Sequence, residues 1–341
     1  MLTDTFFVRY ESFPVFGTFL EREKKLLFQV FTIVEEIRPF WSNTETKRKR
    51  DGTFWESLHK KLSNELGIRW LSNPGPDPII GKWEYKVDAY RTREWIEICR
   101  KWMLEIPAEG CDIDKFIKER ISLVEIGLRE VFEYSKFSGL SGKLDTFTRT
   151  ILAESRKEAR IEHDVAAAEL NIRLSTARVL LDYHNGFLQI TADEITSREI
   201  EKPFWSVVSG SVWLNVDLDM KEALDQRDSG GKDPALYASR ALESKIKIIS
   251  DATGVTTGKE KGAVNYIENL AKGASSFLVD WEADLLRSYF SKVRNPLNHG
   301  SGSLPIPTLR TEQTAWAIES AMSWIKMLIC RLSATGNQAT P

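Results

Sequence analysis

The sequence is poor in cysteine and histidine and carries almost no net charge. Its 341 residues include three cysteines and four histidines, and 47 basic residues nearly balance 49 acidic ones, which leaves a formal net charge of −2. So small a charge gives no global attraction to nucleic acid or to an anionic membrane, and any such contact needs a local patch. Cys99, Cys111 and Cys330 are too few and too widely spaced for a disulfide framework, which indicates reduced thiols.

Long apolar runs are also missing. No uninterrupted run approaches the roughly 20 residues that a membrane-spanning helix needs. The first ten residues carry acid and lack a basic segment followed by an apolar core, so they do not resemble a signal peptide. We therefore expect a cytoplasmic protein with no membrane partner.

The scarcity of histidine bears on metal chemistry as well. His59, His163 and His184 lie in separate helical or turn contexts, and no Cys/His cluster or paired-carboxylate motif has ligand spacing. The acidic residues around Asp217 to Asp228 follow no EF-hand pattern, and Gly230-Gly231 lacks a phosphate-loop lysine. We predict neither a metal nor a cofactor.

Helical periodicity dominates what the sequence does contain. A 42% hydrophobic share with 11 Trp and 17 Phe can build sizeable cores. The pattern predicts a mainly all-α, multi-domain protein. The loop over residues 73–78 and the Gly-rich hinge at 229–231 suggest a helical N-terminal region (1–75), a middle helical region (76–227) and a C-terminal helical bundle (228–335). The predicted helices outside the bundle are 20–41, 54–66, 87–104, 112–137 and 144–183, the last ended by His184-Asn185-Gly186.

The C-terminal bundle is the most legible part. Asp233-Pro234 opens a helix through Ile249. Further helices are expected over 261–271, from Asp280 to about Val293, and from Thr311 onward. Four helices of this length in about 100 residues indicate a four-helix bundle.

The chemistry is concentrated in Arg294-Asn295-Pro296-Leu297-Asn298-His299-Gly300. Pro296 and Gly300 are predicted to force this stretch out of the helix and into a turn. The Arg294 guanidinium is a permanent cation suited to a phosphate, and the His299 imidazole can move a proton near neutral pH. The pair suits a phosphodiester substrate, although a histidine that merely caps a helix end would look the same.

These residues resemble the HEPN superfamily, whose members are small helical bundles and often metal-independent ribonucleases. The signature of that superfamily is Arg, four to six residues, then His, which Arg294 and His299 satisfy, and Arg294-Asn295 matches its common opening. A Glu-x3-Lys element on the first bundle helix is also frequent there, and Glu243 and Lys247 fit it. More narrowly, residues 238–244 and 293–300 resemble the C-terminal domain of abortive-infection proteins.

The resemblance implies RNA cleavage, and the residues suggest how. Without a metal-bound hydroxide, the natural nucleophile is the 2′-hydroxyl of the RNA itself. Its attack on the adjacent phosphate would leave a 2′,3′-cyclic phosphate and a 5′-hydroxyl. That reaction uses one base and one acid, whereas one bundle offers a single histidine. We therefore predict a homodimer or higher homo-oligomer with a composite active site, as the resemblance also implies.

Several assignments remain open on the sequence. Glu243, Lys247 and Arg240 share a helix face, either as surface ion pairs or as a polar shell that positions the motif. Asn295 and Asn298 either shape the loop or touch the ribose. The run Lys47–Arg50 and the six tryptophans between residues 41 and 102 fit RNA binding, but also a solvated loop and a hydrophobic core.

Two hypotheses for the function follow from this reading. The first is an endoribonuclease effector of antiphage defence, whose C-terminal bundle cuts RNA while the N-terminal two-thirds of the chain restrains or targets it. A related possibility is that this enzyme is silent until a phage-derived trigger acts. The second is a non-catalytic helical module that dimerises or binds RNA.

Overall fold

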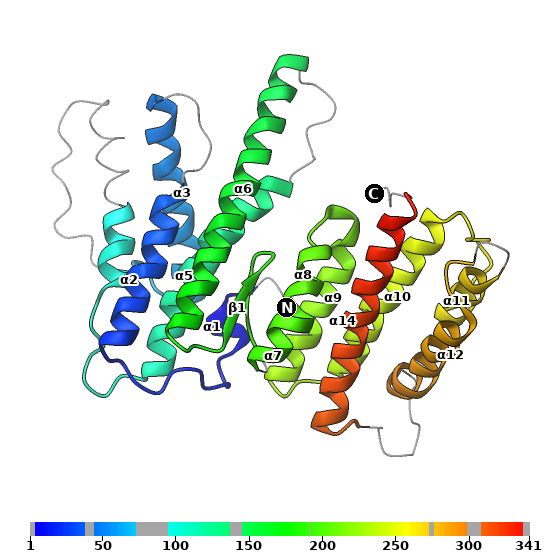
Figure 1. The fold of residues 1–341 in the computed structure, drawn as a ribbon. Helices are drawn as coiled ribbons and strands as arrows, with labels where there is room; N and C mark the ends of the chain where they lie inside the picture. The colour runs from blue at the N-terminus through cyan, green and yellow to red at the C-terminus, as the bar shows by residue number, and fades with distance from the viewer. Residues whose placement is uncertain are drawn as a thin grey trace. The chain divides into compact units, whose positions relative to one another are not determined.

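The structure, a computed structural model, describes residues 4–37, 44–72, 95–136, 145–191, 193–272, 276–298 and 308–336. The prediction of a mainly helical protein is confirmed (Figure 1). The chain divides into two compact units, the N-terminal unit, Thr3–Ile190, and the C-terminal unit, Thr191–Pro341. This division does not coincide with the predicted boundaries: the one at 75/76 lies outside the described residues, and the one at 227/228 lies inside the C-terminal unit.

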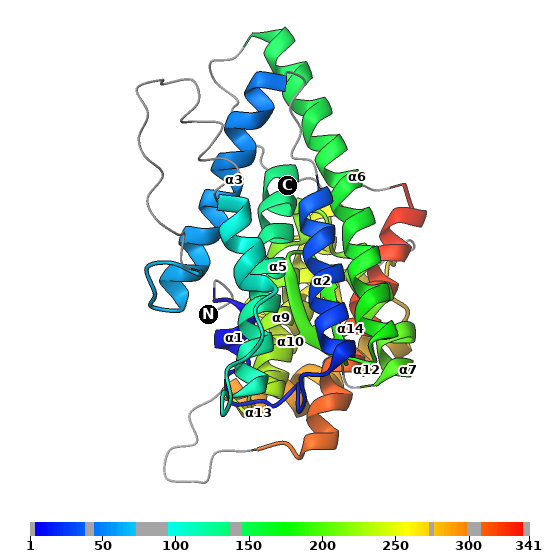
Figure 2. The same ribbon diagram turned by 90° about the vertical axis from the view of Figure 1, so that its left-hand side faces the viewer.

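The N-terminal unit is built around one central helix. It contains α1 (Phe6–Arg9), α2 (Glu21–Glu36), α3 (Thr44–Glu65), a helix over residues 95–103, α5 (Ile113–Lys136) and α6 (Thr146–Thr176). α5 packs against α1, α2, α3 and α6, and α2 and α6 also contact each other (Figure 2). The apolar positions that predicted these helices, such as Leu27, Val30 and Val34, form the core of this unit.

A β-hairpin ends the N-terminal unit and corrects the predicted helix over 144–183. α6 stops at Thr176, and β1 (Leu181–His184) pairs antiparallel with β2 (Phe187–Ile190), with His184 opposite Phe187. Asn185 and Gly186 both have positive φ, 47° and 93°. Two such residues make the tight turn whose twist suits a hairpin. Asn-Gly between short apolar runs thus marks a hairpin here and not the predicted end of a helix.

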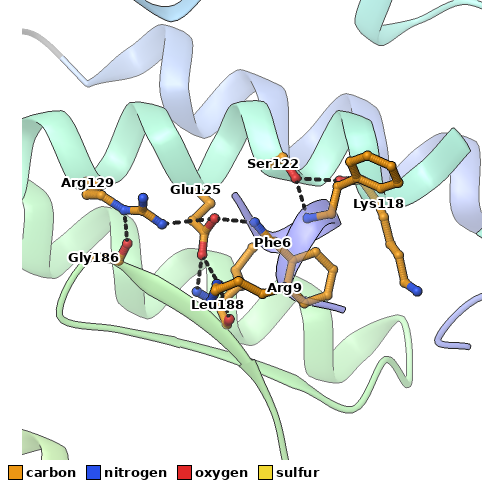
Figure 3. Close-up of polar contacts among 9 residues, drawn as sticks. Phe6, Arg9, Lys118, Ser122, Glu125, Arg129, Gly186 and Leu188 are labelled. Carbon is orange, nitrogen blue, oxygen red and sulfur yellow. Dashed lines mark hydrogen bonds and ion pairs between the residues drawn. The ribbon is translucent and has the colours of Figure 1, made fainter. Parts of the chain in front are cut away.

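A buried carboxylate fastens the first helix and the hairpin to α5 (Figure 3). Glu125, on α5, accepts hydrogen bonds from the Phe6 amide at 2.7 Å and the Leu188 amide at 2.9 Å, and from the Arg9 guanidinium. Arg129 Nη2 lies 3.0 Å from the same carboxylate in an ion pair. Segments more than 60 residues away in the sequence are thereby fixed on one turn of α5.

In the part that the structure describes, the C-terminal unit is built from helices joined by short turns and loops. It begins with α7 (Glu194–Thr196), the π-helical turn η1 (Ser197–Glu201), α8 (Lys202–Val207), the 3₁₀ turn η2 (Ser211–Trp213) and α9 (Leu214–Asp228). It continues with α10 (Pro234–Ala252), α11 (Ala263–Ala271), α12 (Asp280–Tyr289), the π-helical turn η3 (Phe290–Arg294), α13 (Asn295–Asn298) and α14 (Thr311–Ala334). The four helices predicted for the bundle correspond to α10, α11, α12 with η3, and α14.

The bundle starts well before residue 228, where the sequence placed its boundary. α10 packs against α9 and α14, and α14 also contacts α8. Phe204 and Trp205 of α8 and Met220 and Leu224 of α9 belong to the same buried core as Leu242 of α10. The Gly-rich segment at 229–231 is therefore the connection between two packed helices, and it separates no domains.

Other expectations from the sequence meet mixed outcomes. The polar run Lys47–Arg50 was expected in a loop, but α3 begins at Thr44, since Glu, Lys and Arg are good helix formers. Trp55 and Trp102 are buried in the core, while Trp41 and Trp83 lie outside the described residues.

All three cysteines are free. No helix in the described ranges has the length and apolar character needed to cross a membrane.

Candidate functional site

The described part of the Arg294 motif, residues 294–298, lies on a helix and not in the predicted turn. α12, η3 and α13 follow one another without a break from Asp280 to Asn298, and Arg294 is the last residue of the π-helical turn. Pro296 does not break this helix because it sits in the first turn after η3. In this turn the backbone N–H of Asn295 donates to the carbonyl of Phe290, five residues earlier, as in the wider π-helix. Single π-helical turns inside α-helices occur often at functional sites.

A buried tyrosine holds this helix just before the π-helical turn. The hydroxyl of Tyr289 donates to the Ala317 carbonyl of α14 at 3.0 Å and accepts from Ser239 of α10 at 3.3 Å. Burial raises the pKa of Tyr289 to about 12, so the hydroxyl stays protonated and can donate. The start of η3 is thus tied to two neighbouring helices, which sets where Arg294 emerges.

Arg294 reaches across to the predicted Glu-x3-Lys element. Its Nη2 lies 2.9 Å from Glu243 Oε2, and Lys247 Nζ lies 2.9 Å from Glu243 Oε1. One carboxylate therefore bridges two cations, one oxygen for each. The Glu243 side chain is 10% exposed, that of Arg294 24% and that of Lys247 45%. We call Glu243, Lys247 and Arg294 the cationic triad; it carries a net charge of +1 at a partly open surface.

Arg240 belongs to the same face of α10 but turns to another partner. Its Nη2 lies 3.2 Å from Asp219 Oδ1 on α9. Burial raises the pKa of Asp219, an effect that Arg240 partly offsets. The sequence did not predict the structural roles of Asp219 and Tyr289. Both residues contact side chains or carbonyls on other helices, and no spacing along the chain indicates such contacts.

The rest of the predicted motif is only partly visible. The Asn295 amide oxygen lies 3.4 Å from Arg294 Nη1, a long hydrogen bond. Asn298 is the last residue of α13, and its side chain and the whole of His299 lie outside the described residues. The structure thus brings Arg294, Asn295, Glu243 and Lys247 together, while the predicted role of His299 stays a prediction.

A metal ion would need several acidic, histidine or cysteine side chains close together. Across the described ranges, no group of three or more His, Cys, Asp or Glu side chains is arranged to hold one. Glu243 faces two cations, which leaves its carboxylate engaged. The chemistry that the visible site offers is the binding of an anion by positive charge, since a guanidinium is suited to phosphate oxygens.

Comparison with known families identifies the first part of the chain. The match is to a domain of the abortive-infection class, which points to a role in abortive-infection defence. The family model is described as AbiJ N-terminal domain 4 and covers residues 4–206, more than half of the 341 residues, so the chain belongs to that family. Comparisons with curated proteins and with solved structures gave no match.

The match confirms the predicted link to abortive infection through a different part of the chain from the one that suggested it. The sequence pattern pointed to residues 228–335, whereas the family covers residues 4–206. The resemblance of the C-terminal unit to HEPN proteins therefore remains a prediction.

Proposed function

We propose that this protein is an endoribonuclease effector of abortive-infection defence, with its catalytic site in the C-terminal unit. The observation that supports the proposal is the Arg294 guanidinium, fixed by Glu243 at the end of the helix that leads into His299. The AbiJ family supports the defence setting. A defence effector that cuts RNA would harm its own cell, which fits an activity released by a phage-derived trigger.

The chemistry follows from the groups available. The 2′-hydroxyl oxygen of the ribose bonds to the adjacent phosphorus, and the bond from phosphorus to the 5′ oxygen breaks. A base takes the proton of the 2′-hydroxyl, and an acid gives a proton to the leaving oxygen. The products are a 2′,3′-cyclic phosphate and a 5′-hydroxyl.

In this scheme Arg294 holds the phosphate and stabilises its growing charge, and His299 transfers a proton. Because the scheme uses two proton transfers, we assign the second to His299 of another copy, in a composite site about a two-fold axis. Asn295 and Asn298 border the phosphate site, and Glu243 and Lys247 position Arg294 there. Arg240 contributes only through α10, since its guanidinium pairs with Asp219 on α9.

The test is expression of the full chain in a bacterial host, with and without phage infection, followed by mapping of RNA ends. We expect cleavage with cyclic-phosphate ends from the parent and its loss in Arg294→Ala and His299→Ala. Arg287→Ala is the matched control, because Arg287 lies two turns earlier on α12 and pairs with Asp284 at the surface. Cleavage at the parental level by the double variant Arg294→Ala/His299→Ala would refute the proposal.

One observation favours the second candidate, a non-catalytic helical module. Arg294 already has a carboxylate partner and is only 24% exposed, as expected for a structural ion pair. If this is its role, Arg294→Ala lowers the stability of the C-terminal unit and leaves the RNA of the host unchanged. RNA mapping together with thermal unfolding of the same variant separates the two functions.

A further inference from the structure

The side of α6 that faces away from the N-terminal unit carries a regular row of exposed residues. Its members alternate at spacings of four and three along the helix, and every one of them is exposed. The five large apolar members are 45% to 74% exposed. We call this row the α6 seam: Phe147, Ile151, Glu154, Glu158, Ile161, Val165, Ala168 and Ile172.

The seam is distinct from the face by which α6 joins its own unit. α6 packs against α2, α5 and β1 through a separate set of buried residues, Ala159, His163, Ala166, Leu170 and Leu174. Single exposed apolar residues are normal at a protein surface. A row whose spacing alternates between four and three residues is the pattern by which two helices pair side by side. The seam therefore has the form of a helix–helix interface.

Charge along α6 indicates what covers the seam. Residues 146–160 contain four basic and two acidic side chains, a net charge of +2, and residues 161–176 contain one basic and three acidic, a net charge of −2 with His163 neutral. An antiparallel second α6 places each half against the half of opposite charge. A parallel one places like against like and stacks Glu154 and Glu158 on their own copies, which is unfavourable.

The antiparallel arrangement also gives the two glutamates acceptable neighbours. With the two-fold axis near the middle of the seam, Phe147 faces the partner subunit's Ile172 and Glu158 faces the partner subunit's Ile161. Lys157, beside the seam, comes near the partner subunit's Asp164. Each carboxylate can then lie along an apolar neighbour with its oxygens in water, at the edge of the contact.

We propose that the α6 seam is the surface through which two copies of this chain pair, with their α6 helices antiparallel. The proposal is independent of any catalytic activity, because it concerns the N-terminal unit and no residue of the Arg294 site. It also provides a physical reason for two C-terminal units to be held in one particle.

Cross-linking of single-cysteine chains tests both the pairing and its direction. In a full-length background with Cys111→Ser and Cys330→Ser, one protein carries Phe147→Cys and another Ile172→Cys; the remaining native thiol, Cys99, is buried. A short bismaleimide should join the two proteins when they are mixed, and neither alone. The ends of the seam are about 37 Å apart along the helix, so an antiparallel pair keeps like cysteines far from each other.

The interface variant is Ile161→Asp/Val165→Asp in both proteins. It should weaken association at least about a hundredfold, since each carboxylate forced into an apolar contact costs at least a factor of ten. Ile106→Asp is the control, because Ile106 is equally apolar and 74% exposed but lies outside α6. Circular dichroism of all variants should match the parent.

Three outcomes would overturn the proposal. Cross-linking of the Phe147→Cys protein to itself would show a parallel pair. Unchanged cross-linking in Ile161→Asp/Val165→Asp would place the contact elsewhere. A strictly monomeric parent that gives no mixed cross-link would mean that the seam is covered by another part of this chain or by a different protein.

Discussion

Arg294 and Glu243 are 51 residues apart in the sequence and are joined by a hydrogen bond of 2.9 Å between η3 and α10. The bond makes the position of the guanidinium depend on a helix that contributes no predicted catalytic group. Lys247, on the other oxygen of the same carboxylate, adds a second positive charge, so the three side chains together keep a net charge of +1. If Arg294 binds phosphate, Glu243 is the residue that orients the Arg294 guanidinium.

We predict that Glu243→Gln lowers RNA cleavage about tenfold to a hundredfold, because a hydrogen bond between charged groups contributes roughly 1.5–3 kcal/mol. Cleavage rates under single-turnover conditions measure this. Glu268→Gln is the control, since Glu268 pairs with Lys272 at the surface of α11. A faster enzyme would contradict the prediction and would mean that Glu243 restrains Arg294 from its substrate.

Lys245 should destabilise the C-terminal unit at neutral pH. It is fully buried against Trp213, with its Nζ 3.1 Å from the ring centre, and within the described chain this nitrogen has no hydrogen-bond partner. Burial lowers the pKa of Lys245 to about 6. Between about pH 6 and pH 10.5 the unfolded chain holds a proton that the folded chain lacks, so this group makes stability rise with pH.

We predict that Lys245→Met raises the free energy of unfolding by about 1–3 kcal/mol at pH 7, because it removes a buried polar group without a partner. It should also flatten the rise in stability between pH 6 and pH 10. Urea titrations across this range test both effects. Lys247→Met, two residues along the same helix but at the surface, should show neither; a loss of stability in Lys245→Met would contradict the argument.

Acid should weaken the N-terminal unit through His163. This side chain is buried, with Nε2 3.1 Å from the Tyr183 hydroxyl, and burial lowers the pKa of His163 from its usual 6.5. As the pH falls below 6.5, the unfolded chain binds a proton before the folded chain does, so stability falls. His163→Gln keeps a polar group near Tyr183 and does not titrate.

The urea midpoint of this variant should therefore decline less between pH 7 and pH 5 than that of the parent. Because both proteins are neutral at this position at pH 8, the comparison at pH 8 gives the cost of the substitution itself. Parallel declines with acid in the two proteins would show that His163 does not govern the effect.

Removal of the Glu125 carboxylate should loosen the start of the chain. We expect Glu125→Ala to destabilise the N-terminal unit by about 3–5 kcal/mol, because it leaves the buried Arg9 guanidinium and the partly buried Arg129 guanidinium without their shared partner. Hydrogen exchange should accelerate at the amides of Phe6 and Leu188, which donate to Glu125. Hydrogen exchange in α10 and α14 is the internal reference. Acceleration there to the same extent would show that the Glu125 hydrogen bonds do not act locally.

The long amphipathic helices could be read from the sequence because their core is formed by their own periodic residues. Residues 112–137 were expected to be helical, and α5 spans Ile113–Lys136. Where tertiary partners decide the outcome, periodicity was insufficient. The hairpin after α6 was missed because the apolar pattern of Leu181 to Tyr183 also continues a helix. The positive φ of Arg178, just after α6, and of Asn185 and Gly186 in the turn separates the two structures.

In the candidate site, too, some features followed from the sequence and others depend on tertiary contacts. The spacing of Glu243 and Lys247 predicted a shared helix face, and the two side chains do form an ion pair. Arg240 fits the same spacing, yet it turns to Asp219 on α9. The π-helical turn that carries Arg294 has no sequence signature, since it arises from how the helix is held at Tyr289 and Phe290.

The end of the family domain has a practical consequence for how this protein can be divided. The family match runs to residue 206, while the first compact unit stops at Ile190, so the match includes most of α8. Phe204 and Trp205 are buried in the core of the C-terminal unit. A fragment cut at residue 206 would expose two aromatic side chains and leave the other fragment with a hole in its core. The C-terminal unit of this chain therefore completes its core with a helix that lies within the family match.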